Sequence, residues 1–583
     1  MLSFLCPAKK ERFSDYFWCT VLRYCQQPEF YLYMIRIFLF LAATAIFLPA
    51  TAQHQPNQKF WVFLKDKKDV SFDPYTYFDA KAIADKQRRG LPINHPTDWP
   101  VNAKYVAAIT QLSDSVTFRS RWFNAVVCYT SSEKASQISQ LPFVVSVEQA
   151  KNWQSHVASK NDFDKKLNKE EERVLQGQLA TMQSSAFAAK NIDGKGVRVA
   201  IFDAGFTSVD KNPAFEHIRR RNGIIKTRDF VRKRDHVYNY SSHGTMVLSC
   251  VGGIMDGKQI GLATGAEFLL ARTERTLTEF YDEEENWLAA AEWAHQNGAN
   301  VINSSLGYTY HRYFATQMNG RISIVEKAAT MAAAKGILVV NSAGNEGSGD
   351  WKIIGVPAAA DSVLSIGGVS PWEGFHTDFS SYGPTADKRM KPNVTAYGHV
   401  IASGPNGFTS TQGTSFSGPL VAGFAACAWQ TNPNLKAMEL FKEIEKSGNL
   451  YPYYDYAHGF GIPQAGYFAG EPQQTASTPQ KDVLPFELIK TEYGVLVKVE
   501  QEFIPAPAGN AKPGSAPTNK TDAPLPTMDD YLYYHIENSR GYLDKYFVLK
   551  VEQPEVLKLI KSDIGTGKTV RVYYKGHTTE YKF

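Results

Sequence analysis

Four short motifs in the middle of the chain carry side chains that together could break an acyl bond. Asp203 ends the apolar run VAIFD, His243 lies in Ser-His-Gly-Thr, Asn345 lies in a glycine turn, and Ser415 lies in Gly-Thr-Ser. A serine hydroxyl is a poor nucleophile at neutral pH and needs a base to accept its proton. Histidine, with an ordinary pKa of about 6.5, can accept that proton, and an aspartate can fix the imidazole tautomer. These residue types predict nucleophilic catalysis by a serine.

Each motif alone also has an ordinary structural explanation. An aspartate can end a strand in solvent, a histidine can pack at the start of a helix, an asparagine is common in turns, and a serine is a common N-cap. The order Asp203, His243, Ser415 along the chain nevertheless matches one of the known arrangements of a serine triad. The four motifs, in this order and on these elements, resemble the subtilisin-like serine peptidase family.

The resemblance covers about residues 175–470 and implies a role for each motif. Asp203, His243 and Ser415 would form the catalytic triad, and the Asn345 amide with the Ser415 backbone N–H would stabilise the oxyanion. After Gly-Thr-Ser the chain departs from the family's usual residues and reads FSGPL. These changes affect the packing of a helix and no charge-bearing group, so they leave the expected triad intact.

The resemblance also implies a peptide-binding cleft. Ser305, Leu306 and Gly307 would line one side of it, and Ser342, Ala343 and Gly344 the other, each segment offering backbone groups to an extended substrate. Gly355 would lie at the base of the primary pocket and leave it open for a large apolar side chain. A simple turn of the chain explains Gly355 equally well.

Apolar strands and helical patterns alternate around these motifs. Runs such as VRVAIFD at 197–203 and ILVVNSAG at 337–344 are apolar throughout, which is typical of a parallel sheet covered by helices on both faces. A segment at 413–430 is apolar on nearly every side and predicts a central helix. We therefore expect an α/β fold, with the peptidase domain at 171–470.

A small α+β unit precedes this domain. Strand-like runs and helical stretches alternate from 60 to 153, and by its position the unit, with its linker at 53–170, is expected to be an inhibitory prosegment. The enzyme would then cleave itself somewhere within 150–180. The charged segment 162–173 suits either an exposed linker or a solvated helix face.

The first part of the chain has the features of an export signal. A basic start at Met34-Ile-Arg, twelve apolar or small residues and an Ala-Thr-Ala site predict a signal peptide at 34–52, which is too short for a membrane anchor. Residues 1–33 would then be a misassigned upstream extension. The product is expected outside the cell or in its envelope, with Cys128, Cys250 and Cys427 as buried thiols.

Composition limits the partners and cofactors. A net charge of +5 over 583 residues gives no basis for nucleic-acid binding, so protein or peptide substrates are expected. Serine catalysis requires no cofactor. Structural calcium is possible, but the acidic run Asp282–Glu285 lacks the spacing of a calcium loop and is better explained as the start of a helix. The remainder, 471–583, is expected to be β-rich, with a proline-rich loop at 504–527.

Two other functions compete with the peptidase. An α/β-hydrolase esterase would need Gly-x-Ser-x-Gly, but Ser417 occupies the last position, and the downstream pair Asp455 and His458 is very close in sequence. A non-enzymatic scaffold would be expected to have lost a member of the triad, and all three are present. The sequence thus favours a secreted serine endopeptidase that matures from an inactive precursor by self-cleavage.

Overall fold

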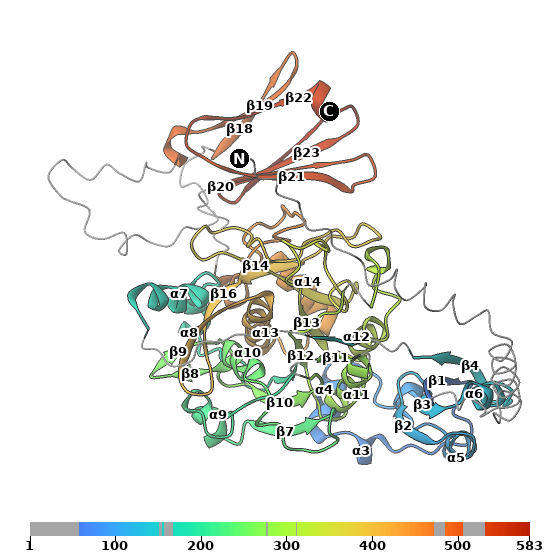
Figure 1. The fold of residues 1–583 in the computed structure, drawn as a ribbon. Coiled ribbons are helices and arrows are strands. Elements are labelled where there is room, and N and C mark those ends of the chain that lie inside the picture. Colours follow the sequence, from blue (N-terminus) through green and yellow to red (C-terminus); the bar gives the residue numbers. More distant parts are fainter. Residues whose placement is uncertain are drawn as a thin grey trace, which may run out of the picture.

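A seven-stranded parallel sheet forms the centre of the molecule (Figure 1). The computed structural model describes residues 57–150, 154–156, 167–275, 278–280, 282–309, 312–471, 484–504 and 531–583. The strands are, in spatial order, β15 (Val394–Tyr397), β14 (Val363–Val369), β13 (Leu338–Ser342), β12 (Val301–Ser304), β6 (Arg198–Asp203), β10 (Glu267–Arg272) and β7 (Ile224–Asp229). All but the edge strand β7 are buried nearly throughout, as expected for a sheet covered on both faces.

Helices cover both faces of this sheet, as the sequence predicts. The core of one face contains residues of several helices, among them α7 (Lys169–Ala180), α10 (His243–Gly252), α13 (Thr414–Thr431) and α14 (Ala437–Lys446). The core of the other face contains α11 (Asp282–Gln296) and α12 (Ile324–Ala334). Every residue of α13 from Phe416 to Trp429 is buried, which explains why this helix is apolar on all sides.

The strand order places β6 at the point where the chain changes direction across the sheet. From β6 the chain continues to β7 and β10 on one side, and it then crosses to β12 on the other side. In open parallel sheets, functional groups collect at the carboxyl ends of the strands at such a point. Asp203 is the last residue of β6 and therefore lies at this edge.

The N-terminal unit is a four-stranded antiparallel sheet with its own helices. Its strands are, in spatial order, β2 (Ser115–Ser120), β3 (Ala125–Thr130), β1 (Gln58–Leu64) and β4 (Val144–Gln149), and its longer helices are α4 (Ala80–Arg88), α5 (Ala103–Gln111) and α6 (Ser132–Ser139). The strand-like run at 115–130 is a hairpin, because residues 121–124 turn the chain and Asn124 has a φ of 48°.

This small sheet uses its two faces differently. Phe60 and Val62 of β1 face a core shared with α5 and α6. Trp61, between them, joins the core that contains α11 and α12 of the large domain. Because neighbouring strand residues point to opposite faces, one face of the sheet packs on its own helices and the other on the large domain.

The C-terminal region consists of two antiparallel sheets around one apolar core. One sheet contains β18 (Phe486–Thr491), β19 (Gly494–Val499) and β22 (Glu555–Ile560), and the other contains β20 (Tyr531–Glu537), β21 (Leu543–Lys550), β23 (Thr569–Tyr574) and β24 (His577–Lys582). The region docks on the large domain through Tyr533 and Tyr573, whose rings contact Tyr453, and the Tyr573 hydroxyl donates to the Asn449 carbonyl at 2.6 Å.

Several sequence predictions fall outside the described residues, namely the signal at 34–52, the upstream segment 1–33 and nearly all of the proline-rich loop. Cys128, Cys250 and Cys427 are free and buried, as predicted. Within the ranges that the structure describes, no helix combines the length and the apolar character needed to cross a membrane. Residues 169–173 of the charged segment lie in α7, so the helix interpretation is confirmed for that part.

Helices α10 and α13 pack so closely that they require glycine at their contact. A Cβ atom added to Gly423 would lie 2.6 Å from the Val251 carbonyl oxygen. Gly423→Ala is therefore expected to force the two helices apart and to lower the free energy of unfolding by about 1–3 kcal/mol. Gly307→Ala is the matched control, because its nearest neighbour would be 3.9 Å away. Denaturant unfolding of both variants measures this, and an unchanged Gly423→Ala protein would contradict it.

Candidate active site

Asp203 and His243 meet at the carboxyl edge of the central sheet. The Asp203 carboxylate has no exposed surface and accepts a hydrogen bond from the Ala204 N–H at 2.7 Å. His243 is the first residue of α10, and its Nδ1 lies 2.9 and 3.0 Å from the two Asp203 oxygens. The residue after it must be glycine, because a Cβ at Gly244 would lie 2.3 Å from the Gly205 carbonyl oxygen.

The carboxylate sets the protonation of the imidazole. Burial disfavours the charged imidazole, but the attraction of Asp203 and the hydrogen bond to it outweigh burial and raise the pKa of His243 above its ordinary value. The His243 side chain is still about one-third exposed, at 32%. One ring nitrogen is thus held by Asp203, and the other can meet a second group from the solvent side.

Ser415 lies in the first turn of α13, and a proline shapes its surroundings. Pro419 has no N–H to donate to the Ser415 carbonyl one helical turn earlier, and the Ser305 hydroxyl donates to that carbonyl instead at 2.9 Å. In return, the Ser415 hydroxyl donates to the Ser305 carbonyl at 3.3 Å. The ring of the next residue, Phe416, packs against His243 with 5.5 Å between the ring centres. No hydrogen bond joins Ser415 to His243 among the described residues.

The Asn345 amide is held in one orientation. Its oxygen accepts the Thr414 backbone N–H at 2.8 Å and the Thr414 hydroxyl at 3.0 Å. These donors fix which end of the amide is oxygen, so the NH₂ group points the other way. The NH₂ group lies beside Gly413, the residue that precedes α13 and has a φ of 134°. Thr414, which sequence reasoning did not single out, therefore orients the donor expected to meet an oxyanion.

The two segments expected to line a cleft differ in what they can offer. The Ala343 N–H donates to Ile366, the Gly344 N–H donates to the Thr414 hydroxyl, and the Gly344 carbonyl accepts from Ser381. The Leu306 carbonyl accepts from the Asn341 side chain, whereas Gly307 is exposed. Ser342–Gly344 can form a wall, but these groups of Ala343 and Gly344 are bonded within the protein, and the binding of substrate by either segment stays a prediction.

Gly355 packs closely instead of leaving open space. A Cβ at this position would lie 2.9 Å from both the Thr309 methyl carbon and the Tyr308 carbonyl oxygen. Tyr308 also pairs with Val356 through backbone hydrogen bonds of 2.9 and 3.1 Å. These neighbours leave no room for a larger residue, so glycine has a structural reason here, and its place at the base of a pocket stays a prediction.

One short strand pair connects the small domain to the large one. Strand β5 (Gln154–His156), which follows the small domain, pairs antiparallel with β11 (Thr278–Phe280), which directly precedes α11. The large domain thus already binds an extended segment of its own chain by strand addition. Neither strand was predicted, because three residues are too few to show an alternating pattern.

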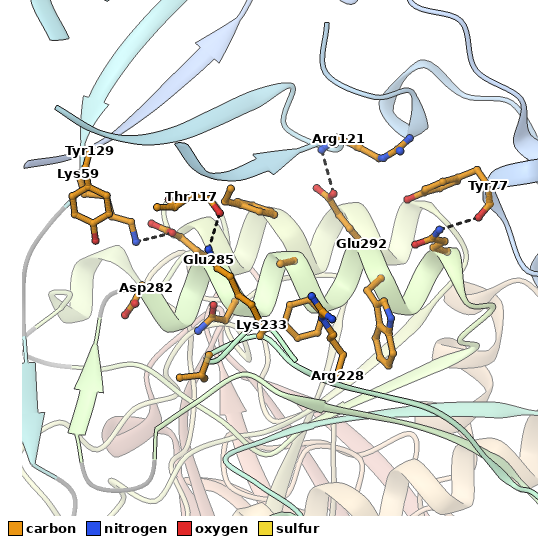
Figure 2. Close-up of a pocket in the computed structure, with 17 residues that line it drawn as sticks. Lys59, Tyr77, Thr117, Arg121, Tyr129, Arg228, Lys233, Asp282, Glu285 and Glu292 are labelled. Atoms are coloured by element: carbon orange, nitrogen blue, oxygen red, sulfur yellow. Dashed lines mark hydrogen bonds and ion pairs between the residues drawn. The ribbon is translucent and has the colours of Figure 1, made fainter. Parts of the chain in front are cut away.

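Glu292 of α11 anchors the small domain. Its carboxylate accepts the Ser120 hydroxyl at 2.6 Å and the backbone N–H groups of Arg121 and Trp122 at 3.2 and 3.1 Å. Figure 2 shows this contact beside a cavity of about 510 Å³ between the two domains, where Lys59 also pairs with Glu285 at 2.8 Å.

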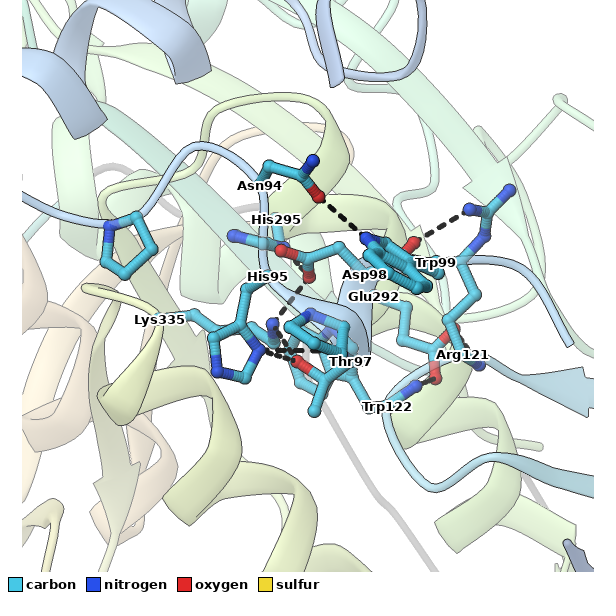
Figure 3. A network of polar contacts seen from close by, with 12 residues as sticks. Asn94, His95, Thr97, Asp98, Trp99, Arg121, Trp122, Glu292, His295 and Lys335 are labelled. Carbon is cyan, nitrogen blue, oxygen red and sulfur yellow. Dashed lines mark hydrogen bonds and ion pairs between the residues drawn. The ribbon is translucent and has the colours of Figure 1, made fainter. Parts of the chain in front are cut away.

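A histidine is also buried at the interface between the two domains. His295 of α11 packs edge-on against Phe78 and Trp122 of the small domain. Close by, Lys335 at the end of α12 forms an ion pair with Asp98 of the small domain (Figure 3). Both ring nitrogens of His295 are buried without a hydrogen-bond partner among the described residues. Burial, together with the charges of Lys86 and Lys335, holds the pKa of His295 well below its ordinary value.

The remaining candidate groups serve structural contacts. Asp455 and His458, the pair that an esterase would need, bond to each other at 3.1 Å, and His458 Nε2 accepts the His376 N–H at 3.0 Å. Asp282–Glu285 forms the first turn of α11, as predicted, and Glu283 pairs with Arg312 at 3.0 Å. Among the described residues, no group of three or more His, Cys, Asp or Glu side chains could hold a metal.

Comparison with known proteins finds two matching family models. Residues 194–461 match the subtilase family, and residues 59–168 match a Peptidase S8 propeptide domain of Bacteroidota. Subtilisin DY of Bacillus licheniformis is 30% identical over 283 residues, which are 48% of this chain and 94% of that protein. Subtilisin E of Bacillus subtilis is 26% identical over 360 residues, 60% of this chain and 84% of that protein.

The contact between Asp203 and His243 predicts a measurable pKa. In a Ser415→Ala protein, the imidazole of His243 should titrate above about 6.5 by NMR, because the carboxylate stabilises its charged form. Asp203→Asn should lower that pKa, since the carboxylate's charge is removed. The other histidines in the same spectra serve as internal controls. A His243 pKa that does not respond to Asp203→Asn would show that the two groups are not in contact.

Proposed function

The chain belongs to the subtilase family and is a subtilisin-like serine peptidase made with a propeptide domain, and on this basis we propose that it is an exported endopeptidase in which Asp203, His243 and Ser415 are the triad. The observation that carries the proposal is the pairing of the buried Asp203 carboxylate with the first residue of α10. This pairing supports the role of His243 as a base whose tautomer and orientation are fixed before substrate binds.

The proposed reaction begins with Ser415. As its hydroxyl attacks the carbonyl carbon of the peptide bond, His243 Nε2 takes the proton, and the imidazolium is stabilised by Asp203. His243 then returns the proton to the leaving amine, so the C–N bond breaks and an acyl ester on Ser415 remains. Water, deprotonated by His243, hydrolyses this ester and restores the hydroxyl.

Two donors would stabilise the negative oxygen that forms on the substrate. One is the Asn345 NH₂ group, which Thr414 turns away from its own side chain, and the other is the backbone N–H of Ser415 at the start of α13. The positive end of the helix dipole favours the same charge. Substrate would bind as an extended strand along β11 and Gly307, since β11 already pairs with a strand of the chain itself.

We further propose that the small domain inhibits the enzyme until it is cleaved off. Strand β5 would occupy the position of a substrate on β11, and the bond to be cut would lie after β5, in 157–166. The contacts of Glu292 and the apolar core shared through Trp61 would keep the cleaved domain in place. The apolar segment and small-residue site at 37–52 support export before this step.

Loss of the nucleophile tests the proposal directly. Ser415→Ala should accumulate uncleaved precursor, because without the hydroxyl no acyl-enzyme forms. Intact-mass analysis of the purified protein measures this, and the wild-type protein should react with a fluorophosphonate probe that the variant does not bind. Ser417→Ala, two residues further along the same helix, is the control and should be processed normally. Normal processing of Ser415→Ala would remove the self-cleavage hypothesis.

Buried His295 makes retention of the cleaved domain dependent on pH. In the complex its pKa lies well below 6.5, whereas departure of the small domain removes Phe78, Trp122 and Lys86 from around it. The freed histidine thus binds a proton more readily, so its contribution to the complex is full above about pH 6.5 and is lost as the pH falls below that value.

Other charged and polar groups lie at the same interface. Burial raises the pKa of Glu285 to about 7 in the complex, which acts in the opposite direction, and Asp98, Lys335 and Glu292 surround His295. The effect of His295 is therefore measured as the difference in the pH dependence of domain release between the wild type and His295→Gln. Between pH 7 and pH 5, release of the cleaved domain should accelerate more in the wild type, by up to about tenfold per pH unit. Size-exclusion chromatography measures this, and parallel pH profiles would contradict it.

A further inference from the structure

A buried arginine contacts three elements that surround the Asp203–His243 pair. Arg272 is the last residue of β10 and lies beside Asp203 in the sheet register. Its Nε donates to the Ala204 carbonyl at 2.9 Å, and one of its terminal nitrogens lies 3.1 Å from the Asp229 carboxylate at the end of β7. Its guanidinium lies 3.7 Å from the centre of the Tyr240 ring. One side chain thus joins the ends of β6 and β7 to the loop that leads into α10.

Tyr240 is held in an unfavourable backbone conformation. Its φ is 77°, a region that bulky residues avoid because Cβ meets the backbone, so this conformation persists only while the surrounding residues hold it. Arg232 and Arg234 also lie over this ring, at 5.1 and 5.5 Å from its centre. Each such contact with a guanidinium is favourable, because the ring face attracts a cation. The Tyr240 hydroxyl is buried and has no hydrogen-bond partner among the described residues, so the ring and not the hydroxyl makes the contact.

The position of Tyr240 is transmitted to His243 through Ser241. The Ser241 hydroxyl accepts the backbone N–H of His243 at 3.1 Å, and the Ser241 carbonyl accepts the Thr207 N–H at 3.0 Å. The loop also presses on the chain after Asp203. A Cβ at Gly205 would lie 2.6 Å from the Ser241 nitrogen and 3.1 Å from the Tyr240 Cβ. A displaced Tyr240 ring would therefore move both the start of α10 and the backbone beside the carboxylate.

We propose that Arg272 and Tyr240 are positioning residues for the peptidase reaction: the stacked pair holds the loop at 239–242 so that the His243 imidazole faces the Asp203 carboxylate. The inference rests on the proposed function of the triad. Neither residue contacts the imidazole or the Ser415 hydroxyl, so they act through the two residues that do the chemistry. The exposed guanidiniums of Arg232 and Arg234 also lie over the Tyr240 ring.

Two substitutions at Tyr240 separate the ring from the hydroxyl. Tyr240→Phe keeps the stacked ring and should retain kcat within about twofold. Tyr240→Leu removes the ring and should lower kcat by about 10–100-fold with KM changed less than threefold, because the loop relaxes and the imidazole loses its alignment. The acid limb of the kcat/KM profile should also move down toward about pH 6.5, since a weaker contact with Asp203 stabilises the imidazolium less. A merely structural loss would lower the amount of folded enzyme and leave this pH profile unchanged.

Arg272→Lys tests the other member of the pair. Lysine keeps a positive charge beside buried Asp229, so this variant avoids leaving an unpaired buried carboxylate, but it loses the planar group that stacks on Tyr240. It should repeat the kcat and pH changes of Tyr240→Leu, and Arg220→Lys, on the exposed surface, is the matched control.

Active sites are counted with a fluorophosphonate probe, so kcat refers to functional enzyme only. Wild-type kinetics in both Tyr240→Leu and Arg272→Lys, or equal losses in Tyr240→Phe and Tyr240→Leu, would overturn the inference while the wild type remains active. A wild-type protein that neither reacts with the probe nor cleaves peptides would instead refute the proposed function.

Discussion

The carboxylate of Asp203 has no access to water, and a buried charge is stable only when other groups compensate it. Its partners are one backbone N–H and one imidazole, and the imidazole reaches it because α10 begins there and Gly244 lets the helix approach the sheet. The position of α10 then fixes that of α13, since the two helices touch at Gly423. The site thus follows from one strand end and the two helices that close over it.

The parts of the site that the sequence revealed are those encoded in short segments. Apolar strands end in Asp203 and precede Asn345, and His243 and Ser415 each open an apolar helix, so type and position can be read within a few residues. The hairpin at 115–130 is hard to read from the sequence because β-branched and aromatic residues continue through both of its strands, and only Asn124 marks the turn.

Other features depend on neighbours that are distant in the chain. Thr414 holds the Asn345 amide from 69 positions away, and Arg272 stacks on Tyr240 from another strand. Pro419 is typical of a helix break because it has no N–H to donate. Here the hydroxyl of Ser305, 110 residues before Ser415, donates to the Ser415 carbonyl in its place. The two explanations of Gly355 could not be separated from the sequence for the same reason, since only the fold brings Thr309 against it. Such pairings come from tertiary packing, on which local propensity carries no information.

The three described cysteines would divide unequally if the small domain were cleaved off, as proposed. Cys128 would leave with it, whereas Cys250 in α10 and Cys427 in α13 stay inside the helix pair that carries the site. Burial raises the pKa of Cys250 to about 12 and that of Cys427 well above its ordinary value, so neither thiol forms the reactive thiolate. Both thiols would become alkylatable only as the two helices separate, which makes their reactivity a direct gauge of opening around Asp203, His243 and Ser415.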